Sequence, residues 1–229
     1  MPARQTLPPA VPAPRAAPPP APGAAPAGPG AWAALLEANA RWALGRSSAG
    51  ASRSPARRAA LVGSQAPVAA VLGCSDSRVP VELVLDQGVG DLFVVRTAGH
   101  ALDTAALGSL EYAVGVLGVG LVVVLGHENC GALAAAAAVL DGGPRPAGAL
   151  GEVVGELAPA VEDARRSGAR TSLEVSRHHA GATAQALRRS AVVRGAQERG
   201  AVEVVAASYS LSTGLVTAGT AAVAVRAGE

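Results

Sequence analysis

Two short stretches of this chain carry residues that bind metals. Cys74 follows the apolar run 68–73, while His127 directly follows the apolar run 121–126 and precedes Cys130 by three residues. Apolar runs of this length are typical of buried strands. Two thiolates and one imidazole are a ligand set of catalytic zinc sites, which keep the fourth tetrahedral position open for water. The alternative is that the chain's two cysteines are small buried apolar residues, but the paired context favours zinc.

Asp76 and Arg78 add a carboxylate and a guanidinium close behind Cys74. Asp76 can accept a hydrogen bond from water at the metal, and Arg78 can hold that carboxylate in a two-pronged ion pair. The alternative, a surface salt bridge, is disfavoured because both residues lie so close to a proposed ligand. A helix is expected to start just after Cys130, and its N-terminus favours a thiolate at that cysteine. Since zinc lowers the pKa of bound water towards neutrality, this set predicts an enzyme that adds water to a small electrophile.

The elements around these residues predict an α/β fold. If the runs 68–73 and 121–126 are parallel neighbours, both ligand sets meet at the sheet edge where such folds bind ligands. Strands separated by helices indicate a mainly parallel sheet of about four strands flanked by helices, with a C-terminal hairpin or edge strand. Further strands are expected at 92–95 and 202–206 and the hairpin at 209–216. Helices are expected at 31–44, 55–62, 104–117, 131–140, 152–166 and, in two pieces, 173–197.

Composition separates a tail from one domain. Residues 1–30 hold 11 of the 17 prolines and predict a disordered tail, whereas residues 31–229 form a single catalytic domain. The net charge of +2 gives no reason to expect a nucleic-acid partner. The sequence lacks a typical signal peptide or membrane span. Two cysteines needed as thiolates indicate a reducing compartment, so we expect a cytoplasmic location.

Four stretches together resemble one known family in their order and spacing: 74–80, 90–96, 111–113 and 126–131. The family is the beta-class carbonic anhydrases, and the similarity is densest over residues 65–140. The resemblance implies reversible hydration of carbon dioxide to bicarbonate, with one zinc ion per chain bound by Cys74, His127 and Cys130. It also implies that Asp76 orients the attacking hydroxide. In the family this aspartate can instead swing onto zinc, which makes Asp76 a conditional fourth ligand.

Three further positions resemble the plant-type branch of that family. Gln65, Phe93 and Tyr112 match residues of its small-substrate pocket, which the neighbouring subunit helps to form. Without the resemblance, Phe93 and Tyr112 would be interpreted as core residues, as most aromatic residues are. The resemblance implies a homodimer or higher homo-oligomer in which the helix 31–44 packs onto a partner subunit. The alternative is a helix that covers its own domain.

Several polar residues near the motifs are expected to have other roles. We expect Arg96 to form a structural ion pair and Glu128 to be exposed. His100 stands where the family usually has asparagine and is a candidate proton shuttle. For His178 and His179 the simplest expectation is exposure to solvent.

Three rival functions can be compared with this one, and the sequence excludes the second of them. Carbonyl sulfide and carbon disulfide hydrolases resemble the same family and keep the same metal ligands. Nucleoside deaminases also use one histidine and two cysteines, but they require a Cys-x-x-Cys pair that this sequence lacks. A zinc-stabilised binding module without enzymatic activity would not need Asp76 and Arg78 together.

Overall fold

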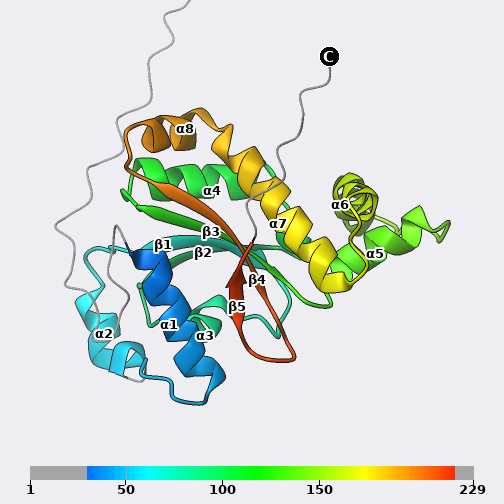
Figure 1. The fold of residues 1–229 in the computed structure, drawn as a ribbon. Helices are drawn as coiled ribbons and strands as arrows, with labels where there is room; N and C mark the ends of the chain where they lie inside the picture. The colour runs from blue at the N-terminus through cyan, green and yellow to red at the C-terminus, as the bar shows by residue number, and fades with distance from the viewer. Residues whose placement is uncertain (1–29, 50, 220–229) are drawn as a thin grey trace, which may run out of the picture.

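A five-stranded sheet forms the centre of the protein (Figure 1). The computed structural model describes residues 30–49 and 51–219, so the predicted tail lies outside the described residues except for Gly30. The strand order is β2-β1-β3-β4-β5, in which the first four are parallel and β5 is antiparallel to β4. The strands are β1 (Ala69–Cys74), β2 (Leu92–Thr97), β3 (Leu121–His127), β4 (Glu203–Tyr209) and β5 (Val216–Ala218). The predicted α/β class with a mainly parallel sheet is confirmed.

The C-terminal hairpin is present, and its second arm extends the sheet. The expected strand 202–206 is instead Glu203–Tyr209, because its last residues continue to pair with β3 as far as His127. The chain then turns over residues 210–215 and returns as β5, where Tyr209 pairs with Val216. The sheet therefore has the four parallel strands that were expected, with β5 as the C-terminal edge strand.

Helices cover both faces of the sheet. Strands β1 and β3 are therefore buried along their whole length. Alternate strand residues pack on opposite layers: Val71 and Val123 face α1 and α3, whereas Leu72 and Val124 face α4, α7 and α8. A third cluster beyond the strand ends joins both cysteines to α5 and α6. The helices are α1 (Ala31–Ala43), α2 (Pro55–Ala60), α3 (Val81–Val84), α4 (Thr104–Gly115), α5 (Gly131–Leu140), α6 (Ala149–Arg166), α7 (Ser172–Arg188) and α8 (Ala191–Glu198).

Helix α1 packs on its own chain, against α3 and β5. Its buried Asn39 connects three segments, since its amide donates to the carbonyls of Val84 and Gly214 and accepts from the N–H of Val216. Within one chain α1 therefore covers its own domain, and its packing onto a partner subunit stays a prediction. Among the described residues, no helix is long and apolar enough to cross a membrane.

The sheet order identifies where a ligand would bind. From β1 the chain continues to β2 on one side, and β3 then lies on the other side of β1. Open α/β sheets bind ligands at the carboxyl ends of the strands where the order reverses in this way. Cys74 ends β1 and His127 ends β3, so both lie at this point.

Candidate metal centre

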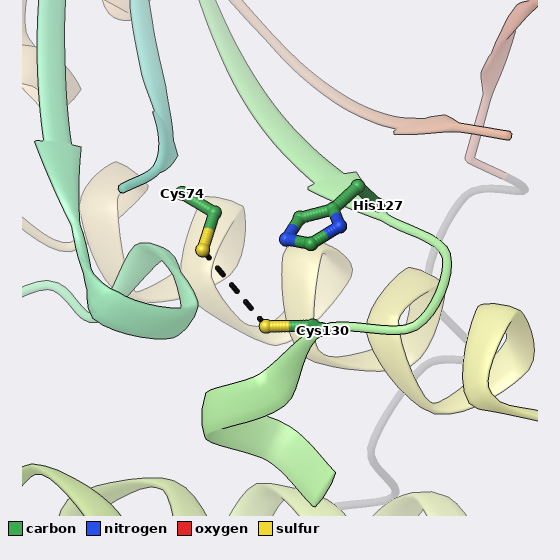
Figure 2. Close-up of side chains that lie close together, drawn as sticks. All are labelled: Cys74, His127 and Cys130. Carbon is green, nitrogen blue, oxygen red and sulfur yellow. Dashed lines mark hydrogen bonds between the residues drawn. The ribbon is translucent and has the colours of Figure 1, made fainter. Parts of the chain in front are cut away.

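Cys74, His127 and Cys130 lie together at the carboxyl ends of β1 and β3 (Figure 2). Their ligand atoms all lie within 4.8 Å of one another, and the two Sγ atoms are 3.9 Å apart. All three residues are buried, and both cysteines are free thiols. The predicted meeting of the two strand-end motifs is therefore confirmed.

The spacing of these atoms suits a zinc ion. A tetrahedral ion with zinc–sulfur bonds of about 2.3 Å would separate two sulfur ligands by about 3.8 Å. The observed 3.9 Å matches that value without rearrangement. The Nε2 atom of His127 is buried and has no hydrogen-bond partner among the described residues, as expected of a nitrogen that binds a metal. The donor set of two sulfurs and one nitrogen is one that zinc prefers.

A hydrogen bond joins the two cysteine sulfurs. The hydrogen bond with Cys130 lowers the pKa of Cys74 to about 4, and His127 contributes in the same direction against the opposing effect of burial. The same sulfur–sulfur contact, together with burial, raises the pKa of Cys130. The backbone N–H groups of Ala132 and Leu133, at the start of α5, act on Cys130 in the opposite sense. Binding of a divalent cation would release the thiol protons, because cysteines bind metals as thiolates.

Hydrogen bonds on its far side orient the ring of His127. Its Nδ1–H donates to the carbonyl of Glu128 at 2.8 Å, which leaves the Nε2 lone pair for a metal. Metal-binding histidines usually donate their second ring N–H in this way. The backbone N–H of His127 donates to Ser176 Oγ at 2.9 Å. Burial lowers the pKa of His127, but the charge of Cys74 and the hydrogen bond to the Glu128 carbonyl raise it overall.

Asp76 and Arg78 form the predicted two-pronged ion pair beside these ligands. Arg78 Nε donates to Oδ1 at 2.9 Å and Nη2 donates to Oδ2 at 2.6 Å. The backbone N–H of Arg78 gives Oδ1 a third hydrogen bond. These bonds hold the pKa of the Asp76 carboxyl well below its usual range. Arg78 also donates to the carbonyl of Asn129, which ties the pair to the loop before Cys130.

Arg96 has a structural role, but it forms no ion pair within residues 30–49 and 51–219, contrary to expectation. Its Nε donates to the carbonyl of Cys74 at 2.7 Å and its Nη2 to the carbonyl of Asp76 at 2.6 Å. The guanidinium from β2 thus holds the turn after β1, because two carbonyls of that turn point towards it. The expectation of an ion pair was wrong because the turn offers backbone acceptors closer than any carboxylate.

Glu128 is half-buried, so the expectation that it is exposed was wrong. Its carboxylate accepts hydrogen bonds from the N–H and hydroxyl of Ser212 and from the hydroxyl of Ser210. These bonds, the Ser212 N–H foremost, lower the pKa of Glu128. The residue joins the loop that bears His127 to the hairpin between β4 and β5, a contact across more than 80 residues.

The histidines also differ from expectation. His179 is buried and not exposed, and its ring stacks on that of His100 with centroids 4.4 Å apart. His100 is fully buried, and burial lowers its pKa well below its ordinary value. A side chain in this state is unsuited to carry protons to solvent, which removes the main argument for a shuttle at His100. His178 is partly exposed and bonds Asp163 at 2.8 Å.

The proposed pocket residues are only partly brought together within one chain. The rings of Phe93 and Tyr112 pair with centroids 6.2 Å apart, whereas Gln65 is exposed. Phe93 packs on the core as expected, but Tyr112 is 40% exposed and is not a core residue. None of the three lines the cavity of about 490 Å³ that lies against Cys130 between α5, α6 and the start of α7.

Two residues that support the ligands gave no signal in the sequence. Ser176 lies in the middle of α7, where a serine is ordinarily exposed. Gly99 donates its N–H to Cys74 Sγ at 3.3 Å from a turn with φ +64°. Gly99 could have been predicted to lie in a turn. The neighbouring sequence gave no sign that its N–H would contact the Cys74 thiol.

Comparisons with known proteins agree with this geometry. A family model described as carbonic anhydrase matches residues 69–216. The chain is 45% identical over 185 residues to carbonic anhydrase 2 of Mycobacterium tuberculosis, covering 80% of this chain and 89% of that protein. It is 43% identical over 187 residues to a carbonic anhydrase of Mycolicibacterium smegmatis, covering 81% of this chain and 90% of that protein.

Solved structures give the same result. The fold is similar to a Coccomyxa beta-carbonic anhydrase in complex with acetazolamide, with TM-score 0.64 and 28% identity over 80% of this chain and 84% of that one. It is also similar to tetrameric beta-carbonic anhydrases from Sordaria macrospora, with TM-score 0.65 and 26% identity over 82% of this chain and 95% of the matched one.

Proposed function

This chain belongs to the beta-class carbonic anhydrases, enzymes of reversible carbon dioxide hydration, and we propose that it works with one zinc ion held by Cys74, His127 and Cys130. The observation that carries the proposal is the buried cluster of two sulfurs and one unpaired imidazole nitrogen at the strand ends. A zinc ion in such a site makes water a nucleophile near neutral pH, because it acts as a Lewis acid.

We propose that Asp76 orients the attacking oxygen. An ionised carboxylate offers about four lone-pair positions. Arg78 occupies two on Oδ1 and one on Oδ2, which leaves one acceptor position on Oδ2. Because Arg78 keeps its pKa low, Asp76 stays ionised and can only accept. An oxygen that donates its proton to Asp76 must then direct a lone pair elsewhere, and the carbon of carbon dioxide is the electrophile it would attack.

Arg78 has the role of holding Asp76 in place. Arg78 donates hydrogen bonds both to Asp76 and to the carbonyl of Asn129. These bonds connect the loop after Cys74 with the loop before Cys130, which supports this role. In a second state that the family resemblance implies, a carboxylate released by the arginine becomes a fourth metal ligand. Asp76 is then a conditional ligand, and its ion pair with Arg78 favours the state in which the site is open to water.

A second copy of the chain completes the site in this proposal. We propose that Gln65, Phe93 and Tyr112 line the substrate pocket together with residues of that copy, as in the plant-type branch. The similar beta-carbonic anhydrases from Sordaria macrospora are tetrameric, which supports a homo-oligomer here. A cytoplasmic location rests on the need for two free thiols.

Stopped-flow measurement of carbon dioxide hydration tests the function directly. Purified protein with one zinc per chain should hydrate carbon dioxide much faster than it hydrolyses carbonyl sulfide. A protein that binds zinc but hydrates carbon dioxide no faster than buffer would instead be a zinc-stabilised binding module. The ion pair of Asp76 and Arg78 argues against that alternative, because metal binding alone does not require an oriented carboxylate.

A further inference from the structure

Helix α7 reaches both metal-bearing strand ends with two side chains that lie one turn apart. Ser176 and His179 are three residues apart, so they lie on the same face of the helix. Ser176 Oγ accepts the backbone N–H of His127 at 2.9 Å. His179 Nε2 donates to the carbonyl of Gly99 at 3.0 Å, and the N–H of Gly99 donates to Cys74 Sγ at 3.3 Å. One helical turn therefore contacts the supports of two ligands on different strands.

We infer that His179 is a positioning residue of the metal site: from α7 it holds the Gly99 turn against the Cys74 sulfur while Ser176 holds His127. The inference rests on the proposal that Cys74, His127 and Cys130 bind zinc. It concerns how tightly and in what geometry the metal is held, and it assigns His179 no contact with the reacting atoms.

The turn that His179 holds has a costly backbone conformation. Gly99 has φ +64° and the next residue, His100, has φ +46°. The cost lies at His100, because a residue with a side chain rarely adopts a positive φ. Such conformations persist only where the surroundings enforce them. A Cβ atom at Gly99 would lie 2.7 Å from a methyl group of Leu157, so a side chain at this position would require Leu157 to shift. The turn therefore depends on its neighbours for its shape.

His179 supplies two of the contacts that enforce this shape. Its ring donates to the Gly99 carbonyl, and its face packs on the ring of His100 at 4.4 Å. Burial lowers the pKa of His179 to about 4, so the ring is neutral near pH 7 and carries a single N–H. That N–H must be on Nε2, since Nε2 faces a carbonyl.

Ser176 holds the second ligand because α7 lies very close to β3 at this point. A Cβ atom at Gly126 would come within 2.6 Å of Ser176 Oγ, so only glycine allows the helix to approach. The fully buried Ser176 can then accept the His127 N–H. The same helical turn thus positions His127 directly and Cys74 through Gly99.

The test compares zinc affinity in single variants of the full-length chain. Loss of a residue that supports a metal ligand typically weakens metal binding about 10–100-fold. We expect a loss of that size for His179→Ala, measured by competition with a chromophoric chelator. His179→Gln should recover most of the affinity, because its amide N–H can reach the same carbonyl. The neighbouring His178, which is half-exposed and bonds Asp163, provides the matched control, and His178→Ala should stay within about twofold of wild type.

Cobalt substitution gives a second readout that a general loss of stability would not produce. The thiolate-to-cobalt charge-transfer band reports on the sulfur ligands, so His179→Ala should shift or weaken it, while His178→Ala leaves it unchanged. Wild-type zinc affinity and an unchanged band in His179→Ala would overturn the inference. If that variant does not fold, Ser176→Ala carries the test, and unchanged zinc affinity there would overturn it equally. Failure of the wild-type chain to bind zinc would instead refute the proposed function.

Discussion

Replacing Asp76 by asparagine tests the central assignment of the site, because it changes charge and hydrogen bonding but hardly changes size. Oδ1 accepts two N–H groups of Arg78, and Oδ2 accepts Nη2 at 2.6 Å. An asparagine can supply an oxygen at only one of these positions. Its NH₂ group would face a guanidinium donor at the other, or would turn towards the water that it should orient. Either orientation removes the acceptor that the proposed mechanism needs.

The expected result of Asp76→Asn is a large loss of turnover with full retention of zinc. Removing one positioned electrostatic interaction typically lowers kcat by about 100-fold or more. Zinc should remain, since Asp76 is not among the three clustered ligands. The measurements are carbon dioxide hydration by stopped flow with a pH indicator and zinc content by elemental analysis of the same sample.

A matched control separates this effect from the loss of a negative charge. Asp163 is an exposed carboxylate that also pairs with an arginine, Arg166, at 3.2 Å. Asp163→Asn should keep its activity within about twofold of wild type, as surface substitutions usually have small effects. Wild-type turnover in Asp76→Asn would refute the mechanism. A similar loss in both variants would show that the effect comes from overall charge and not from the position of Asp76.

Three further predictions follow from the same contacts. Arg78→Ala should retain zinc but lose activity at neutral pH, because the pKa of Asp76 rises only towards its usual range and the released carboxylate, still ionised, competes for the metal. Raising the pH should restore part of the rate as hydroxide competes better, and a rate that stays flat with pH would contradict this. The double variant Cys74→Ser, Cys130→Ser should lose zinc in elemental analysis, and retention of one zinc per chain would disprove the ligand assignment. Asn39→Ala should lower the free energy of unfolding by about 2 kcal/mol or more, since each buried polar group left unpaired costs about 1–3 kcal/mol; urea denaturation showing less than about 0.5 kcal/mol would contradict it.

The sequence alone predicted the candidate metal centre. Cys74 and His127 each directly follow a buried apolar run, Cys130 comes three residues after His127, and two such runs that pair as parallel neighbours bring their carboxyl ends together. Asp76 and Arg78 are two residues apart, so their ion pair forms within one turn of chain. These features could be predicted because each depends on local spacing and on the topology of one sheet.

Only the tertiary structure decided what supports those ligands. Ser176 and Gly126, and His179 and Gly99, meet across 50 and 80 residues, and Glu128 reaches Ser212 across 84. The expectations for His179 and Glu128 failed for one reason. A polar side chain is usually exposed unless a partner meets it in the interior, and that partner is set by how helices and hairpins pack on the sheet. The spacing of residues along the chain does not reveal that packing, because the contacting groups belong to elements that are far apart in the sequence.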